Sequence, residues 1–320
     1  MTWTAAGTGA VEFAGMSPGA FARGGRSGRN CGVNLLLPSI AATPLSRAGS
    51  AAGPAETAGE DAGSVVNYFD SHEAAARYAG SRPQSHGRVL EMLRRILGAN
   101  LPVGRALDVG CGTGHSTVAL LPMAGTVVGL DASPFMLAQA CRMPGVEYRC
   151  GYAEALPFGR GEFDLLTVCS AYHWFDQDRF LREAGRVLRT DGWLVLYKVG
   201  STGKIAHRPD FETWRREVFR ARYPKTARND EQPSEDKATE AGFQEVARER
   251  RSHAVRHTLD AYVDNLLTHG SLIRAIDSQR EPVGAAREWL RGELSPVFEA
   301  GTAEFVHEDW LHVLRRKSAS

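Results

Sequence analysis

The sequence contains little cysteine for its length, and its few thiols follow no recognisable pattern. Five cysteines are spread over 320 residues. They form no C-x-x-C pair and show no cysteine–histidine spacing typical of a zinc site, so we expect neither a structural metal nor a disulfide framework. Unpaired thiols are typical of a reducing compartment, and we therefore predict a cytoplasmic protein.

Long apolar runs and an excess of one charge are also absent. No run approaches the ~20 residues that a membrane-spanning helix needs. The formal net charge is +1 at pH 7, so bulk electrostatics indicate no nucleic-acid partner and no membrane. The partner that we expect is a small-molecule substrate, and the chain itself is expected to be a monomer or a homodimer.

The first 64 residues have no sustained hydrophobic period and are rich in glycine, alanine, serine, threonine and proline. Such a segment cannot bury enough apolar surface to offset its ordering entropy, so residues 1–64 are predicted to be disordered, and the fold is predicted to occupy residues 65–320. Two alternatives remain open. Four arginines against the single acidic residue Glu12 in the first 55 residues resemble a targeting peptide, and the start codon could be mis-assigned.

Residues 106–114 have the sequence Ala-Leu-Asp-Val-Gly-Cys-Gly-Thr-Gly, an apolar strand that ends in glycines at alternate positions. A helix is predicted to follow over residues 115–121. A strand that ends in a glycine turn and leads into a helix forms the nucleotide crevice of an open α/β sheet. Glycine suits such a turn because it adopts positive φ and lets a ligand approach the backbone.

One of two acidic residues near this crevice, Asp108, favours S-adenosylmethionine (SAM) over NAD(P). Asp108 stands two residues before the first glycine, where its charge would oppose a pyrophosphate at the helix N-terminus. SAM has no phosphate and carries an ammonium and a sulfonium. Asp131 ends a second apolar strand at the distance expected for an acid that binds ribose hydroxyls, which suits either cofactor. An NAD(P)-binding oxidoreductase therefore remains an alternative.

Strands and helix-length segments alternate along the middle of the chain, which indicates a doubly wound, mostly parallel α/β sheet. The predicted strands are residues 105–109, 126–131, 146–151, 163–171 and 193–199. The predicted helices around them are residues 71–78, 85–97, 133–141 and 178–188. Further helices are predicted at 210–222, 259–267 and 284–294, and further strands at 243–254 and 309–315.

His173 follows the fourth predicted strand, at the carboxyl edge where open α/β sheets bind ligands. An imidazole titrates near working pH, so His173 is a candidate base or positioner of the nucleophile. A structural histidine beside Trp174 is the alternative. Tyr172 is a second candidate catalytic residue that could equally pack in the core, and Asp176 is predicted to cap the next helix.

Residues 107–114, 129–131, 153–158 and 186–192 together resemble class I SAM-dependent methyltransferases. The segment Ala-Tyr-His-Trp-Phe-Asp at 171–176 is similar to small-molecule enzymes related to trans-aconitate methyltransferase, in the methyltransferase type 11 family. The resemblance implies a Rossmann-like sheet of seven strands with the last one antiparallel. It also implies that helical inserts at about 201–242 and 258–300 form a substrate cap.

The resemblance further implies which residues bind SAM. Asp108 and the glycines would hold the methionine moiety, Asp131 the ribose, and Ala132 with Met136 the adenine, whose edge Ala153 and Glu154 would face. Many relatives have aspartate where this chain has Tyr152, so adenine recognition here would rest on Ala153 and Glu154. The full expected set is Asp108, Gly110, Cys111, Gly112, Gly114, Asp131, Ala132, Met136, Ala153, Glu154 and Ser170.

The function that this resemblance implies is methyl transfer from SAM to an oxygen or nitrogen of a small molecule, either a carboxylate or a natural-product type of metabolite. A second hypothesis keeps the fold and uses bound SAM as a scaffold for a cyclisation or rearrangement.

Overall fold

The structure is a computed structural model that describes residues 69, 71–81, 86–225, 229, 231–298 and 300–318. Residues 1–68 lie outside the described residues. The prediction of disorder for residues 1–64, together with its two alternatives, therefore lies outside them as well.

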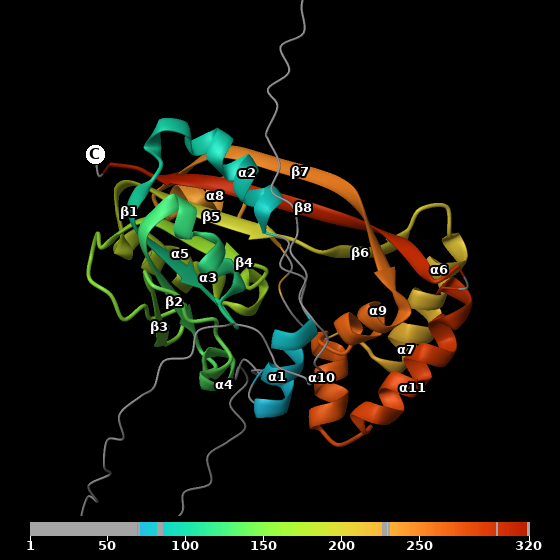
Figure 1. Cartoon of the computed structure of the whole chain (residues 1–320). Helices are drawn as coiled ribbons and strands as arrows, with labels where there is room; N and C mark the ends of the chain where they lie inside the picture. Colours follow the sequence, from blue (N-terminus) through green and yellow to red (C-terminus); the bar gives the residue numbers. More distant parts are fainter. Residues whose placement is uncertain are drawn as a thin grey trace, which may run out of the picture. The chain divides into compact units, whose positions relative to one another are not determined.

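A large sheet forms the centre of the described fold (Figure 1). Its strands run in the order β3-β2-β1-β4-β5-β8-β6, and β7 pairs with the other edge of β8. Neighbours among β1 to β5 are parallel, whereas β8 is antiparallel to β5, β6 and β7. The strands are β1 (Val103–Val109), β2 (Ala124–Asp131), β3 (Val146–Cys150), β4 (Phe163–Cys169), β5 (Leu188–Lys198), β6 (Ser201–Ile205), β7 (Phe243–Thr258) and β8 (Thr302–Arg316).

The predicted fold class is confirmed, with one strand more than the seven expected. The additional strand is β6, which lies at the start of the insert predicted to be helical and pairs with the first half of β8. Strand β8 is long enough to pair with β5 through residues 310–315 and with β6 through residues 305–307. The sheet therefore continues beyond the end of β5.

Side-chain caps fix the starts of several helices. Ser133 accepts a hydrogen bond from the backbone N–H of Met136. Asp176 accepts one from that of Arg179, so the cap predicted at Asp176 is confirmed. The helices are α1 (His72–Ser81), α2 (Gly87–Leu97), α3 (His115–Ala119), α4 (Pro134–Ala138), α5 (Gln177–Val187), α6 (Pro209–Trp214), α7 (Arg220–Arg222), α8 (Glu235–Glu240), α9 (Leu259–Leu266), α10 (Gly270–Asp277) and α11 (Val283–Leu294).

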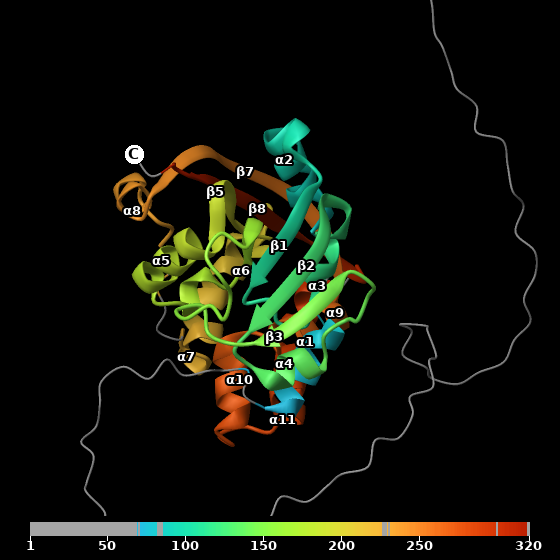
Figure 2. The same ribbon diagram turned by 90° about the vertical axis from the view of Figure 1, so that its left-hand side faces the viewer.

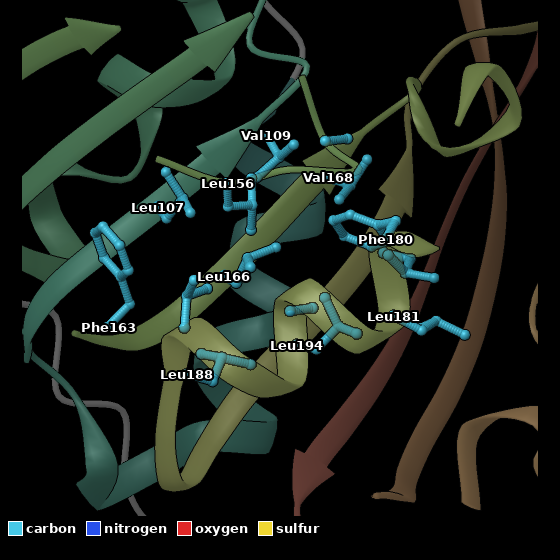
Figure 3. Close-up of a cluster of buried hydrophobic side chains, with 14 of the residues drawn as sticks. Leu107, Val109, Leu156, Phe163, Leu166, Val168, Phe180, Leu181, Leu188 and Leu194 are labelled. Atoms are coloured by element: carbon cyan, nitrogen blue, oxygen red, sulfur yellow. The ribbon is translucent and has the colours of Figure 1, made fainter. Parts of the chain in front are cut away.

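The inner parallel strands β1, β2, β4 and β5 are buried on both faces over most of their length, which explains the apolar runs within them. On one face, Leu107, Leu166 and Leu194 of neighbouring strands pack with α5 (Figure 3). On the other face, Leu165 and Val195 pack with α2. Successive residues of a strand thus contribute to two separate cores, which we call the α5-side core and the α2-side core.

A third core lies under helices α6, α9, α10 and α11. We call these four helices the helical layer. Phe305 of β8 is buried in this core, so β8 joins the sheet to the helical layer (Figure 1). The second half of the first predicted insert lies elsewhere, because Ala238 of α8 packs in the α5-side core.

The predicted helix over residues 210–222 contains a π turn at Arg215–Phe219. Within this turn Phe219 is buried like Phe211 of α6, whereas Val218 is 41% exposed. The wider π turn changes the angular position of the residues that follow α6.

Helix α1 connects two distant parts of the fold at the carboxyl edge of the sheet. It lies beside α4 and α10 in both views (Figures 1 and 2). Arg77 forms an ion pair with Asp277 of α10 at 3.3 Å. Just before α1, the carbonyl oxygen of Phe69 accepts a hydrogen bond from the Ser133 hydroxyl at 2.6 Å. Among the described helices, none is both long and apolar enough to cross a membrane.

Replacing Gly129 of β2 with alanine should lower the free energy of unfolding by about 1–3 kcal/mol, as expected for overpacking. A Cβ there would lie 2.7 Å from the Tyr148 ring and 2.9 Å from the Thr117 hydroxyl. Gly292→Ala in α11 is the matched control, because no atom lies within 4 Å of its added Cβ. That variant should gain about 0.5–1 kcal/mol from helix propensity. Urea unfolding followed by circular dichroism checks both, and equal effects would contradict this packing.

Candidate functional site

The glycine turn after β1 has the conformation that its sequence predicts. Gly110, Gly112 and Gly114 all have positive φ, at 70°, 54° and 79°. The backbone N–H groups of Gly110 and Cys111 both donate to the carbonyl oxygen of Leu130, at 2.8 and 3.0 Å. The turn is therefore held against the end of β2.

Close contacts explain why two of these positions lack a side chain. A Cβ on Gly110 would lie 2.5 Å from the Cβ of Ala171, and one on Gly112 would lie 3.0 Å from the Met136 methyl carbon. Cys111 is buried within the turn, and burial raises the pKa of its thiol well above the usual value. This thiol is consequently neutral and serves packing better than nucleophilic chemistry.

Asp108 lies fully buried beneath the glycine turn, with 0% exposure. One carboxylate oxygen accepts hydrogen bonds from Ser116 at 2.7 Å and Thr117 at 2.8 Å, and the other accepts one from Thr167 at 2.9 Å. Burial raises the pKa of Asp108 to about 6, although these three hydroxyls oppose the rise. The carboxylate thus ties β1 to α3 and β4, and its predicted contact with the methionine moiety stays a prediction.

Asp131 joins the end of β2 to the glycine turn. Its Oδ2 accepts a hydrogen bond from the Gly112 N–H at 2.7 Å, and its Oδ1 accepts one from the Ser133 N–H at 2.9 Å. Burial raises the pKa of Asp131 despite these two bonds. A carboxylate has about four lone-pair sites, so each oxygen keeps the capacity to accept from a ribose hydroxyl.

The residues expected around adenine come from the segments that follow β2 and β3. Met136 is buried beside Gly112, and the Ala132 carbonyl oxygen lies 3.6 Å from the Cys150 sulfur. Ala153 is buried in the α5-side core. Glu154 accepts a hydrogen bond from the Asp176 N–H at 2.9 Å, which links this segment to the start of α5.

Three predicted residues follow β4. Ser170 has a φ of 55°, an uncommon conformation for a residue with a side chain, and its N–H donates to the Tyr197 carbonyl oxygen at 2.9 Å. Tyr172 is buried against Phe180, with ring centroids 5.8 Å apart, so its position favours packing over catalysis. His173 is partly exposed, and its ring lies 4.6 Å from that of Trp174.

His86, at the start of α2, reaches the same edge of the sheet and was not predicted. Its Nδ1 lies 3.9 Å from the Cys169 sulfur, and its ring meets that of Tyr197 edge-on at 6.1 Å. Burial, together with neighbouring His115, lowers the pKa of His86 to about 4. Nothing in the local sequence indicates this contact, because it requires the packing of α2 against the ends of β4 and β5.

The part of the chain that contains the glycine turn resembles known methyltransferases. Residues 107–196 match the family described as "Methyltransferase domain". An uncharacterized methyltransferase of Synechocystis is 49% identical over 73 residues, which cover 22% of this chain and 34% of the relative. The uncharacterized methyltransferase YcgJ of Bacillus subtilis is 36% identical over 99 residues, or 29% and 39% of the two chains. This chain therefore aligns with little more than a third of each of these relatives.

A solved structure from Anaeromyxobacter dehalogenans, assigned by inference as a type II methyltransferase, has the same fold. It superposes with a TM-score of 0.51 and 23% sequence identity, and the match covers 71% of this chain and 95% of that chain. The resemblance to class I SAM-dependent methyltransferases of type 11 is thereby confirmed.

Asp108→Asn should stabilise the protein at pH 7. The pKa of Asp108 is higher in the folded state than in the unfolded state. The folded protein therefore loses stability as pH rises between these two pKa values, here from about 4 to about 6. Asparagine removes this cost, so the gain should be on the order of 1–3 kcal/mol at pH 7 and should vanish near pH 4. Urea unfolding at several pH values measures it. Glu91→Gln on the exposed surface of α2 is the control, and a pH-independent effect would contradict the burial of this charge.

Proposed function

We propose that this chain, whose residues 107–196 form a methyltransferase domain, is an enzyme that transfers a methyl group from SAM to an oxygen or nitrogen of a small molecule. The observation that carries the proposal is the bond between Asp131 and the Gly112 N–H at 2.7 Å. It brings an acid suited to ribose hydroxyls directly to the turn where the backbone can approach a ligand.

The surroundings of α3 favour SAM over a dinucleotide. The first turn of a helix attracts anions, and here the hydroxyls of Ser116 and Thr117 already bind the Asp108 carboxylate. A pyrophosphate at this position would lie beside two carboxylates, those of Asp108 and Asp131. The ammonium and sulfonium of SAM would instead be stabilised by their negative charge.

The remaining predicted residues fit this cofactor by position. Ala132, Met136, Ala153 and Glu154 would enclose the adenine, and Ser170 would face the methionine side at the end of β4. The structure thus offers acceptor oxygens for the ribose from β2 and a shaped backbone from the glycine turn.

SAM supplies an electrophilic methyl group, so the chain has to align an acceptor with it. Alignment of the reacting atoms can contribute up to about 7–11 kcal/mol of the barrier when the geometry is ideal. We assign His173 as a positioner or base for the acceptor, because it follows β4 on the ligand edge and remains partly exposed. The cytoplasmic location that the sequence predicts stays a prediction.

Asp131→Asn should weaken SAM binding by about 10–100-fold, because hydrogen bonds to a charged group contribute about 1.5–3 kcal/mol. Isothermal titration calorimetry with SAM and with S-adenosylhomocysteine measures the affinity. Asp178→Asn, an exposed change on α5, is the control and should bind like wild type.

Two outcomes would contradict this proposal. The first is a wild-type chain that fails to bind SAM at sub-millimolar concentration. The second is heat of binding with NADH but not with SAM, which would favour an oxidoreductase. Release of S-adenosylhomocysteine during turnover distinguishes methyl transfer from a rearrangement that leaves SAM intact.

A further inference from the structure

Residues on one buried face of β8 belong to two apolar cores, and two polar residues lie between these cores. Phe305 belongs to the core of the helical layer, and Leu311 belongs to the α2-side core. The two residues between them on the same face are His307 and Asp309, both buried. A central strand that places a histidine and an aspartate between two apolar cores needs a polar partner there.

Strand β7 adds two histidines to these two polar residues. His253 lies directly opposite His307 in the β7–β8 register. The Nε2 atoms of His257 and His307 are 3.1 Å apart, a hydrogen bond in which one ring donates and the other accepts. We call His253, His257, His307 and Asp309 the His–Asp cluster.

Arg88 of α2 determines which nitrogen of a neutral His253 carries the proton. Its guanidinium donates to His253 Nε2 at 2.5 Å, so the proton of a neutral His253 is on Nδ1, which lies 3.6 Å from an Asp309 oxygen. Arg88 Nε also lies 3.4 Å from the same oxygen, Asp309 Oδ2. Burial and the neighbouring His257, His253 and Arg88 lower the pKa of His307 to about 4, so this ring is neutral at pH 7.

The other carboxylate oxygen of Asp309 has no hydrogen-bond partner among the described residues. Asp309 is 1% exposed, and an unsatisfied buried acceptor costs about 1–3 kcal/mol, more when charged. An ionised carboxylate oxygen only accepts, so its missing partner must be a donor. Within the described part of the chain, no group of three or more histidine, cysteine, aspartate or glutamate side chains is arranged to hold a metal ion.

The His–Asp cluster lies between the end of the parallel sheet and the helical layer. Leu311 pairs with Tyr197 near the end of β5, and Asp309 is two residues, roughly 7 Å, further along the same face. On the other side, the His257 ring lies 5.9 Å from that of Tyr262 in α9.

The first turn of α2 connects the His–Asp cluster to the cofactor edge. Arg88 contacts Asp309, while His86 of the same turn contacts Cys169 at the end of β4, the residue before Ser170. The cluster therefore lies beside the strand ends that would face the methyl group, on the side of the helical layer.

We propose that the His–Asp cluster binds the methyl acceptor, and that the acceptor presents a hydroxyl or an amine to the free oxygen of Asp309. This inference rests on the proposed methyltransferase function and narrows its substrate class. A carboxylate acceptor is disfavoured, because its charge would lie against a buried carboxylate.

The reaction then balances without a further reagent. The acceptor's lone pair forms the new bond to the methyl carbon, and the electron pair of the broken carbon–sulfur bond stays on sulfur. The acceptor's proton passes to the Asp309 carboxylate, so His173 is then a positioner of the acceptor and not its base. Arg88, whose Nε donates to Asp309 Oδ2 at 3.4 Å, positions this carboxylate.

The test incubates the full chain with methyl-deuterated SAM and a mixed metabolite extract, and the labelled products are then treated with mild alkali. We expect products that resist alkali, because methyl ethers and methylamines are stable whereas methyl esters are hydrolysed. Mass-spectral fragmentation then assigns the label to oxygen or nitrogen. Labelled products that alkali cleaves would overturn the inference and leave the methyltransferase function intact.

Asp309→Asn tests the role of the cluster directly. Methyl transfer should fall by about 10²-fold or more, while the affinity for S-adenosylhomocysteine stays within about twofold of wild type. Glu304→Gln is the matched control, since Glu304 is an exposed acid on the same strand that pairs with Arg256. If Asp309→Asn does not fold, His257→Gln, at a less buried position, should still lower transfer by about tenfold.

Transfer at the wild-type rate by a folded Asp309→Asn, or by His257→Gln where that variant takes its place, would refute the assignment. A wild-type chain that binds SAM but labels nothing in the extract would instead refute methyl transfer itself, and the inference with it. The two failures are thus distinguishable by calorimetry and product analysis on the same preparations.

Discussion

The buried carboxylate of Asp108 is the constraint on which the nucleotide half of the structure depends. A charge at 0% exposure needs hydrogen bonds that compensate its lost hydration, and three hydroxyls do so in part here, because burial still raises the pKa of Asp108 to about 6. Because these hydroxyls come from α3 and β4, the carboxylate fixes the glycine turn, the following helix and the neighbouring strand relative to one another. The Gly112 N–H donates a hydrogen bond to Asp131, which holds the same turn from the β2 side.

The parallel half of the fold was predictable because its signals are local. The apolar run of β1 leads into Gly110, that of β2 ends at Asp131, and the caps Ser133 and Asp176 stand one residue before their helices. Strand β6 was not predictable. Its sequence Ser-Thr-Gly-Lys-Ile has no apolar alternation, and it is extended only because β8 runs past the end of β5 and offers unpaired backbone groups.

The sequence predicts the residues that we propose for cofactor binding but not the His–Asp cluster that we propose for acceptor binding, because only the first set is close together in the sequence. Asp108, the glycines and Asp131 lie within 24 residues of sequence and carry a recognisable spacing. His253 and His307 are 54 positions apart and meet only through the β7–β8 register. The alternation around Asp309 becomes visible only in the structure, where every second residue from 303 to 313 is buried and two of these are polar.

The position of β8 explains why the residues proposed to bind the acceptor are separate from those proposed to bind the cofactor. It contributes Leu311 to the core that supports the cofactor edge and Phe305 to the core of the helical layer, so both cores constrain the two polar residues between them. If the His–Asp cluster binds the acceptor as proposed, a substitution at His307 or Asp309 would change the chemistry offered to it without touching Asp108 or Asp131, which belong to other strands. The two sets of residues share a sheet edge but no hydrogen bond among the described side chains, so acceptor specificity would then vary on β7 and β8 while the glycine turn stays constant.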